Sequence, residues 1–344
     1  MPICRAVLLL GMFSIWVSAV AAQTSGSCAG CHAREAATQP DTQMGRAMQV
    51  PGDNPELSAH PNLSVHRGDY AYSLVTKNGR TIYSVTDGAQ TISIPVQWSM
   101  GSGAQTWLLE WDGQFYESMV SYYPSIQSLD VTIGDDRLHP TTLAEAIGRP
   151  LLTEGVTTCF GCHSTNAVVN RQLSLATAEP GVTCGHCHVG AEAHSEAMMA
   201  GDTSVTPPQL GRLSSEDLSD FCGQCHRSFD LVVRAGWRGP SNVRFQPYRL
   251  ALSRCFDGAD ARISCVACHD PHQEVVRNAA FYDSRCLACH SAAASQAPPH
   301  AKVCPVAKAN CTSCHMPRVK LPDSHFVFTD HDIRVVKANA PYPY

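Results

Sequence analysis

The sequence has few aromatic residues and no surplus of positive charge. Phe, Trp and Tyr make up 7% of its 344 residues, and leucine-rich helical stretches are scarce. We therefore expect a thin side-chain core for a chain of this length. The formal net charge is −5, which argues against nucleic acid as a partner. After residue 22, no stretch of the sequence is apolar for long enough to cross a bilayer.

Residues 1–22 have the pattern of a secretory signal peptide. Arg5 supplies the positive start, residues 6–20 form an apolar run, and small residues suited to cleavage follow at 21–22. A membrane anchor is the alternative, but the apolar run is short for spanning. The residues before Cys28 do not form a lipobox, so a lipoprotein is not expected. We expect an exported protein, either periplasmic or extracellular.

One pattern, C-x-x-C-H, occurs seven times. It uses fourteen of the 17 cysteines, namely Cys28, Cys31, Cys159, Cys162, Cys184, Cys187, Cys222, Cys225, Cys265, Cys268, Cys286, Cys289, Cys311 and Cys314. The pattern indicates covalent attachment of c-type heme. Two thiols one helical turn apart reach the two vinyl groups of a porphyrin, and the next residue gives its imidazole to the iron. The predicted proximal ligands are His32, His163, His188, His226, His269, His290 and His315.

Other cysteine chemistries explain this pattern less well. Zinc sites use C-x-x-C pairs but do not need a His directly after each pair. Disulfides account for an even number of cysteines but not for the His. Redox motifs of the thioredoxin type come singly on a βαβ unit, and the sequence does not indicate such a unit. We therefore predict seven covalently bound heme c groups, which would form much of the core and without which the chain is not expected to fold.

The distribution of the motifs divides the chain into four parts. These are the signal peptide at 1–22, a first heme-binding segment at 23–62, an antiparallel β insert at 63–133 and a six-heme-binding domain at 134–344. Within the insert, Asn-Gly and Asp-Gly pairs predict tight turns, and strands are predicted at 82–85, 92–98, 106–111 and 115–122. The Trp and Tyr residues of the insert are expected to form its own core, although they could also pack on a heme or bind a partner. The expected fold is mainly α and irregular, packed around hemes, with a small antiparallel β-sheet inserted.

Short spacings are typical of the rest of the chain. From Cys159 onward the first cysteines of successive motifs stand 25, 38, 43, 21 and 25 residues apart, too few for independent globular units. We expect helix, turn and heme to alternate, with neighbouring porphyrins close together. Residues 49–62 are predicted to form a loop and residues 141–148 a short helix. Residues 213–226 are predicted to form a helix with Ser214 or Ser215 as its N-cap.

Nine of the 16 histidines lie outside the seven proximal positions, and most of them are expected on the other side of an iron. The predicted distal ligands are His139, His194, His272, His300, His325 and His331. His186 lies inside a motif and faces away from its own heme, while His60 and His66 are expected to be packed or solvated. For the seventh iron, Met44 is the candidate and Met48 its rival, with core packing as the alternative for both.

The motifs resemble those of multiheme c-type cytochromes. The resemblance includes the C-H-D-P-H run at 268–272 and the C-H-M-P run at 314–317. The chain is similar to the doubled-CXXCH group and to the superfamily of tetraheme cytochromes, hydroxylamine oxidoreductase and cytochrome c nitrite reductase. The resemblance implies hemes in near-contact pairs and distal roles for His194 and His272. Two features depart from it, because the sequence has no C-x-x-C-K catalytic site and the strands at 63–133 are foreign to those enzymes' heme core.

Irons with both axial positions filled favour electron transfer, with donor and acceptor proteins as partners. The alternative is a multiheme oxidoreductase acting on a small nitrogen or sulfur compound at one five-coordinate heme, which would be the first heme if Met44 and Met48 are core residues. A third possibility is self-assembly, or docking on a membrane complex. Cys255 and Cys304 remain, and in an oxidising compartment they are expected to form a disulfide.

Overall fold

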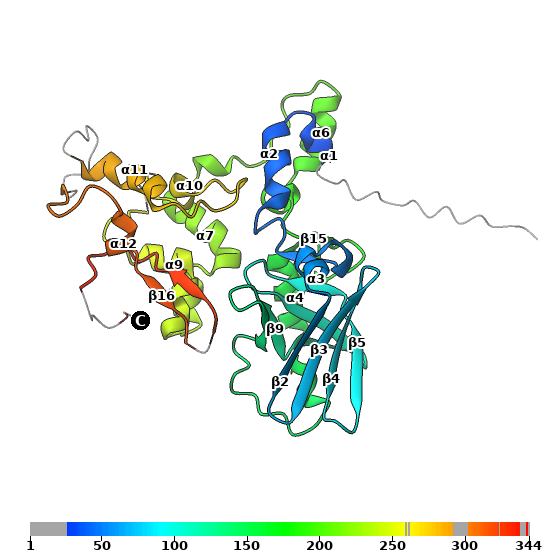
Figure 1. The fold of residues 1–344 in the computed structure, drawn as a ribbon. Helices are drawn as coiled ribbons and strands as arrows, with labels where there is room; N and C mark the ends of the chain where they lie inside the picture. Colours follow the sequence, from blue (N-terminus) through cyan, green and yellow to red (C-terminus); the bar gives the residue numbers. More distant parts are fainter. Residues whose placement is uncertain are drawn as a thin grey trace, which may run out of the picture.

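The chain folds into a strand-rich part and two groups of helices (Figure 1). This computed structural model describes residues 26–258, 260, 262–291, 302–322, 324–337 and 342. Helices make up 33% and strands 23%, with several antiparallel sheets. The fold is therefore a mixed α/β fold, and the expectation of a mainly α, heme-packed fold with one small sheet is wrong. The signal peptide predicted at 1–22 and the predicted ligand His300 lie outside the described residues.

A four-stranded antiparallel meander forms one face of the strand-rich part. Its strands, in order, are β2 (Asn62–Arg67), β3 (Tyr70–Lys77), β4 (Arg80–Thr86) and β5 (Thr91–Pro95). Alternate residues of β3 are buried, as period-2 patterning requires, and Tyr72 and Leu74 point inward. The predicted turn at Asn78-Gly79 joins β3 to β4 with φ of 53° and 70°, the positive values that a type I′ turn needs.

A second antiparallel sheet packs against the meander. Its order is β1 (Met48–Gln49), β6 (Trp98–Met100), β7 (Thr106–Trp111), β8 (Gln114–Ser118) and β11 (Gly148–Pro150), and the hairpin β9 (Val120–Tyr123) with β10 (Ser128–Val131) lies beside it. The Asp112-Gly113 turn joins β7 to β8, again with both φ positive. Because β1 and β11 come from outside 63–133, the sheet is completed by segments that were predicted to belong to the heme-binding parts.

The buried apolar residues concentrate in the strand-rich part. The larger cluster lies between the sheets and includes Trp107, Tyr83 and Tyr122, and the smaller one joins Met48 and Phe160. The hydroxyl of Tyr83 donates to the carbonyl of Ile147 at 2.9 Å, which satisfies the polar end of a fully buried ring. The expectation of a thin side-chain core is thus wrong for residues 48–178, because the few aromatic residues are gathered here. As predicted, the insert's Trp and Tyr residues contribute to this core.

The helices are short and lie outside these sheets. The α-helices are α1 (Gly26–Ala29), α2 (Ala33–Thr38), α3 (Pro55–Ala59), α4 (Thr153–His163), α5 (Cys184–Cys187), α6 (Ala191–Met199), α7 (Ser215–His226), α8 (Phe229–Arg234), α9 (Gln246–Ala251), α10 (Cys265–Cys268), α11 (Ala279–His290) and α12 (Cys311–His315). Single 3₁₀ turns are η1 (Gln39–Asp41), η2 (Pro51–Asp53), η3 (Glu145–Ile147), η4 (Leu210–Arg212) and η5 (Pro240–Arg244). Figure 1 shows α1, α2 and α6 together above the sheets, and α7 with α9 to α12 in a second group at the side.

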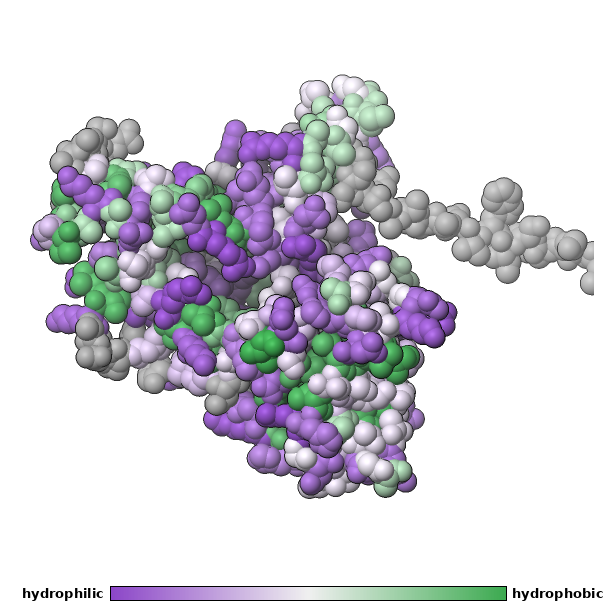
Figure 2. All heavy atoms as spheres, viewed as in Figure 1, coloured by the Kyte–Doolittle hydropathy of each residue, from purple (hydrophilic) through white to green (hydrophobic). Residues whose placement is uncertain are grey.

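Short two-stranded ribbons complete the fold. They are β12 (Ser164–Thr165) with β15 (Glu179–Pro180), β13 (Val168–Val169) with β14 (Gln172–Leu173), and β16 (Arg318–Lys320) with β17 (Val327–Thr329). In the described part of the chain after residue 183, no cluster of buried apolar side chains comparable to those of the sheets is found. Figure 2 shows apolar residues at the surface of this part, and Val306 is 89% and Val335 74% exposed.

Local sequence signals predicted some helices better than others. The predicted helix at 213–226 is α7, and Ser214 is its N-cap, with its hydroxyl accepting from the amide of Asp217 at 3.1 Å. The predicted helix at 141–148 is reduced to the single turn η3. There Gly148, with φ of 149°, begins β11 and pairs with Ser118 of β8, and a Cβ at Gly148 would meet the Glu117 carbonyl. Within the predicted loop at 49–62, α3 forms because Asn54 caps it.

A buried ion-pair network holds the end of the described chain against α9. The fully buried Arg249 binds Asp330 through two nitrogens, at 2.8 and 3.0 Å, and Asp332 at 3.1 Å, while Arg334 contacts Asp330 at 2.6 Å. This network fixes the residues on either side of His331. Among the helices that the structure describes, none is long and apolar enough to cross a membrane.

Candidate heme centres

All seven C-x-x-C-H motifs lie on helical turns. In α4, α7 and α11 the motif forms the last turn and the helix ends at the His. The helix α12 is the motif alone, α5 and α10 run from the first to the second cysteine, and α1 ends inside the motif. The amides of His32, His188 and His269 each bond to the carbonyl of the first cysteine of their motif, at 2.8, 2.9 and 2.9 Å. The two thiols of each motif therefore lie one turn apart on one face, as attachment to one porphyrin edge requires.

Many of the imidazoles are oriented through Nδ1. Backbone carbonyls lie 2.7 to 3.0 Å from Nδ1 of five histidines, namely His163 (Ala47), His194 (Val205), His290 (Lys302), His315 (Arg334) and His331 (Thr329). In His272 the partner is a carboxylate, with Nδ1 3.3 Å from Oδ1 of Asp270. Such contacts fix the ring and its tautomer and leave Nε2 for a metal, which is the usual second shell of a metal-binding histidine.

Two pairs of imidazoles have the separation of rings that share one metal. An imidazole nitrogen lies about 2 Å from a bound transition metal, so two rings on opposite sides of an iron have centroids about 6 Å apart. The centroids of His188 and His272 are 6.1 Å apart with ring planes at 7°, and those of His269 and His331 are 6.2 Å apart at 40°. The predicted distal residues His272 and His331 thus lie opposite proximal histidines of other segments.

Burial lowers the pKa of His188, His269 and His331 and so favours their neutral form, which is the form that binds iron. Burial and, to a smaller extent, the neighbouring His269 lower the pKa of His331 to about 4. Burial also lowers the pKa of His188, with smaller contributions from His272 and His32. The backbone of His272 is held by the hydroxyl of Thr38, which donates to its carbonyl at 2.7 Å. The first heme segment and the C-H-D-P-H run therefore meet beside the third motif.

The remaining predicted distal ligands have different surroundings. Nε2 of His325 lies 2.8 Å from Oδ2 of Asp130, and its ring packs edge-on against Tyr123 at 4.8 Å. His139 is exposed in a loop. Met44 is partly buried in a turn, where its carbonyl accepts from the amide of Val182.

Three histidines and one methionine outside the predicted ligand set also have clear positions. His60 bonds through Nε2 to the Tyr122 hydroxyl at 2.8 Å, so it is packed, and His66 is exposed on β2. His186 is held by the backbone of Ser164, and burial lowers its pKa. Met48 is a core residue that is 1% exposed.

Cysteines of different motifs touch one another. Cys162 shares a hydrogen bond with Cys225, Cys222 with Cys265, and Cys286 with Cys311. These contacts link the second, fourth and fifth motifs, and the sixth with the seventh. The bond from the partner thiol lowers the pKa of Cys162 and of Cys265 to about 7.

The described residues contain neither a cluster of metal-ligand side chains nor the expected disulfide. In the described ranges, no three His, Cys, Asp or Glu side chains gather as a site for a metal ion. Cys255 and Cys304 are free thiols, so the expected disulfide is absent. Burial raises the pKa of Cys255, which lies near Cys268 and Cys289, whereas the amides of residues 306 and 307 lower the pKa of Cys304. The two thiols therefore have separate surroundings.

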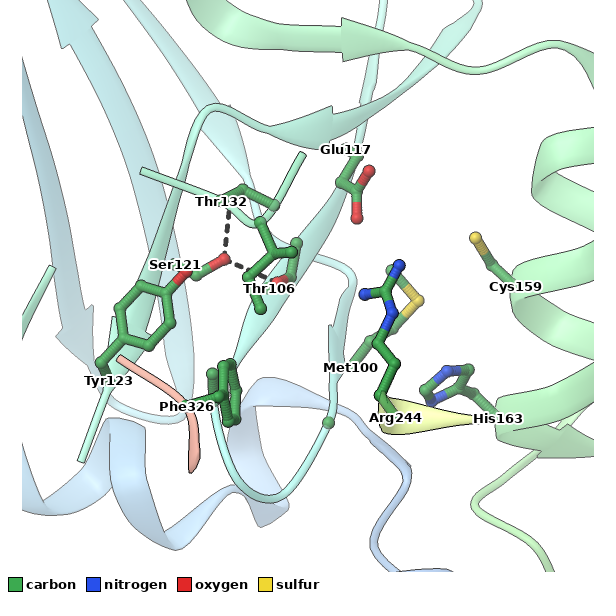
Figure 3. Close-up of a pocket in the computed structure, with 13 residues that line it drawn as sticks. Met100, Thr106, Glu117, Ser121, Tyr123, Thr132, Cys159, His163, Arg244 and Phe326 are labelled. Carbon is green, nitrogen blue, oxygen red and sulfur yellow. Dashed lines mark hydrogen bonds between the residues drawn. The ribbon is translucent and has the colours of Figure 1, made fainter. Parts of the chain in front are cut away.

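A cavity of about 250 Å³ opens beside the second motif (Figure 3). Cys159 and His163 of α4 form one side, strand residues including Met100 and Glu117 another, and Arg244 of η5 and Phe326 complete it. Figure 3 shows Arg244 extending into the cavity between the helix and the sheet. Local sequence patterns do not indicate this cavity, because it joins four distant segments and only Cys159 and His163 belong to a motif.

Comparison with protein-family models, with curated proteins and with solved structures finds no match to this chain. The resemblance to multiheme cytochromes therefore stays a prediction that rests on the motifs and on the geometry around them.

Proposed function

We propose that the protein is an exported heptaheme cytochrome c that transfers electrons between redox partner proteins. The observation that carries the proposal is the pairing of His188 with His272 and of His269 with His331 at the distance of two axial ligands. Each pair joins a motif histidine to a histidine from a distant segment. Bis-imidazole irons bind no substrate but accept and release electrons, and ligand type and burial tune their potential.

The chain offers a fitting environment for the hemes. The thiols of all seven motifs lie on or beside a helical turn, which supports attachment, and six histidines have Nδ1 held by a carbonyl or a carboxylate. In the described residues beyond 183, which carry five of the motifs, apolar side chains do not form a cluster of their own. Valines exposed there, such as Val306 and Val335, are available to contact porphyrins.

The proximity of the motifs supports transfer over a series of centres. Cys222 of the fourth motif contacts the fifth motif, and Cys225 contacts the second. Cys187 of the third motif is close enough to raise the pKa of both thiols of the fourth. Hemes attached at these positions would be neighbours, so electrons could pass between them without leaving the protein. Docking on a membrane complex or self-assembly would supply the donor and acceptor.

Heme content tests the proposal. The protein should be produced in a host with heme-attachment machinery and analysed by intact mass and pyridine hemochrome. We expect seven hemes, and we expect six in the double variant Cys222→Ser/Cys225→Ser. The control Cys304→Ser, outside every motif, should keep seven. A wild-type chain without covalent heme would overturn the proposal.

The oxidoreductase alternative is favoured by one observation, the cavity beside the second motif. The alternative required both Met44 and Met48 to be core residues; Met48 is buried, whereas Met44 is only partly buried, and the open space lies at the second motif rather than the first. Reduction or oxidation of a small nitrogen or sulfur compound would need an iron with a free position. Low-temperature EPR of the oxidised protein distinguishes the two functions, since electron transfer alone needs only low-spin hemes.

A further inference from the structure

Asp283 lies between the sixth and the seventh motif. It is a residue of α11, three positions before Cys286 of the sixth motif, and it is 7% exposed. Its two carboxylate oxygens accept the amides of Asn310 and Cys311, at 2.7 and 2.8 Å, where α12 and the seventh motif begin. Figure 1 shows α11 and α12 next to each other. One carboxylate therefore belongs to the surroundings of both motifs.

The two hydrogen bonds to Asp283 hold the seventh motif in place. The helix α12 consists of the motif alone, and Asn310, which precedes it with φ of 57°, makes no side-chain hydrogen bond to its first turn. The amides at the start of a helix need acceptors, and Asp283 supplies them from α11 in the way that an N-cap side chain does. The helix of the sixth motif thus positions the seventh motif.

The negative charge of Asp283 is stabilised by dipoles and not by a cation of the described residues. The amides of Cys311 and Asn310 and the Cys311 thiol lower the pKa of its carboxyl, against the effect of burial, and no cationic side chain contributes to this shift. Beside the fifth motif, by contrast, the guanidinium of Arg249 neutralises the buried Asp330. Hydrogen bonds from amides stabilise a carboxylate without cancelling its charge, so its field acts on neighbouring groups.

The field of Asp283 reaches the first cysteine of both motifs. Burial is the largest cause of the raised pKa of Cys286, about 12, and of Cys311, and the charge of Asp283 contributes to both shifts. Porphyrins attached at these cysteines would each have an edge near this carboxylate. Reduction of ferric to ferrous iron removes one positive charge from a heme. A negative charge nearby therefore stabilises the ferric form and lowers the reduction potential.

We propose that Asp283 lowers the reduction potentials of the sixth and seventh hemes together, through one ionised carboxylate beside both attachment sites, and that it positions the seventh motif. The inference rests on the proposed function, because it needs hemes at both motifs. It assigns the control of two potentials in the electron-transfer series to a residue outside every motif. Asp283 does not bind iron, so it acts through its charge and through the two amides that it holds.

Redox titration of the heme-loaded protein at pH 7 and constant ionic strength tests the effect of the charge. Asp283→Asn keeps the size of the side chain and one acceptor oxygen but removes the charge. We expect two of the seven hemes to titrate at higher potential, with a change of about tenfold in their redox equilibrium, or about 59 mV for one electron. Asp283→Glu keeps the charge and should keep the wild-type potentials.

The matched control for the charge is Asp220→Asn. Asp220 is an exposed residue of α7, two positions before Cys222 of the fourth motif. Because water and salt screen an exposed charge, the titration of this variant should equal that of the wild type.

Heme content tests the positioning role. Asp283→Ala removes both acceptor oxygens, so intact mass should show chains with six hemes, and peptide mapping should find the motif at 311–315 without heme. Seven hemes in all chains of this variant would overturn the positioning role.

The outcomes separate the inference from its premise. Wild-type potentials in Asp283→Asn, or an equal shift in Asp283→Glu or Asp220→Asn, would overturn the role of the charge and leave the proposed function intact. If Asp283→Asn loses the seventh heme, the potential of the sixth decides in the same way. Absence of covalent heme from the wild type would refute the proposed function itself.

Discussion

The rings of His188 and His272 lie parallel, with an angle of 7° between their planes and 6.1 Å between their centroids. They come from segments more than eighty residues apart. Asp270 holds Nδ1 of His272 at 3.3 Å, and Thr38 holds its carbonyl at 2.7 Å. His272 is thus supported by Asp270 of its own segment and by Thr38 of one distant segment, which is the kind of support that an axial ligand requires.

Removing His272 should change one heme. In His272→Ala we expect one of seven hemes to become high-spin in EPR, because the iron at the third motif loses an axial imidazole. The control His66→Ala replaces an exposed histidine on β2 and should leave the spectrum unchanged. A spectrum of His272→Ala identical to wild type would show that this residue is not a ligand.

Removing His325 should leave all hemes as they are. Its Nε2 is bound to Asp130, which also contacts Arg67 at 3.1 Å, so the structure places it as a link between the sheets and the C-terminal segment. We expect His325→Gln to keep the wild-type EPR spectrum. The free energy of unfolding should fall by less than about 1 kcal/mol, because the pair is partly exposed. Appearance of a high-spin heme would instead support the ligand role that the sequence predicted.

Replacing Arg249 should destabilise the protein strongly. In Arg249→Met two buried carboxylates, Asp330 and Asp332, keep only the partly exposed Arg334 as a cationic partner, which costs up to about 3–5 kcal/mol. Because both flank His331, the heme of the fifth motif should also show partial loss of its low-spin signal. Urea unfolding followed by circular dichroism, with EPR of the folded protein, measures both effects.

The matched control for Arg249 is Arg234→Met. Arg234 pairs with Asp230 at 2.7 Å, but both side chains are more than 60% exposed. Such a pair contributes about 0–1 kcal/mol. Equal destabilisation in the two variants would contradict the importance of the buried network.

Asp135 should make stability depend on pH. Burial raises its pKa to about 7, against the opposing charge of Arg149, while the unfolded value is 3.8. Since the folded state holds the proton more tightly, the stabilisation is complete below about pH 4 and is lost as pH rises through 7. The shift corresponds to at most about 4 kcal/mol, and screening by solvent reduces this to about 1–2 kcal/mol.

The test for Asp135 compares urea midpoints at pH 5 and pH 8. We expect Asp135→Asn to lose the drop in stability that the wild type shows between these values. Asp69→Asn, in an exposed turn, is the control and should keep the drop. A wild type with equal midpoints at both values would exclude the raised pKa.

Short-range sequence signals were sufficient to predict several local features of the structure. The C-x-x-C-H spacing placed two thiols on one helical turn, Asn78-Gly79 formed the expected hairpin turn, and Ser214 capped α7. Each depends on residues within about four positions, where backbone geometry alone sets the neighbours. The same reasoning failed at 141–148, because Gly148 gains a sheet partner in Ser118.

Long-range packing settled the rest. The low aromatic content of the whole sequence did not predict the side-chain core, because Trp107, Tyr83 and Tyr122 gather in one part of the chain. Distant segments decide which histidines face each other. They also decide that His325 contacts Asp130 and that Arg244 lies beside the second motif. Local sequence patterns cannot predict which distant residues will be in contact, because many different pairings of the same residues are compatible with their spacing in the sequence. Burial of apolar area and compensation of buried charge select one of them.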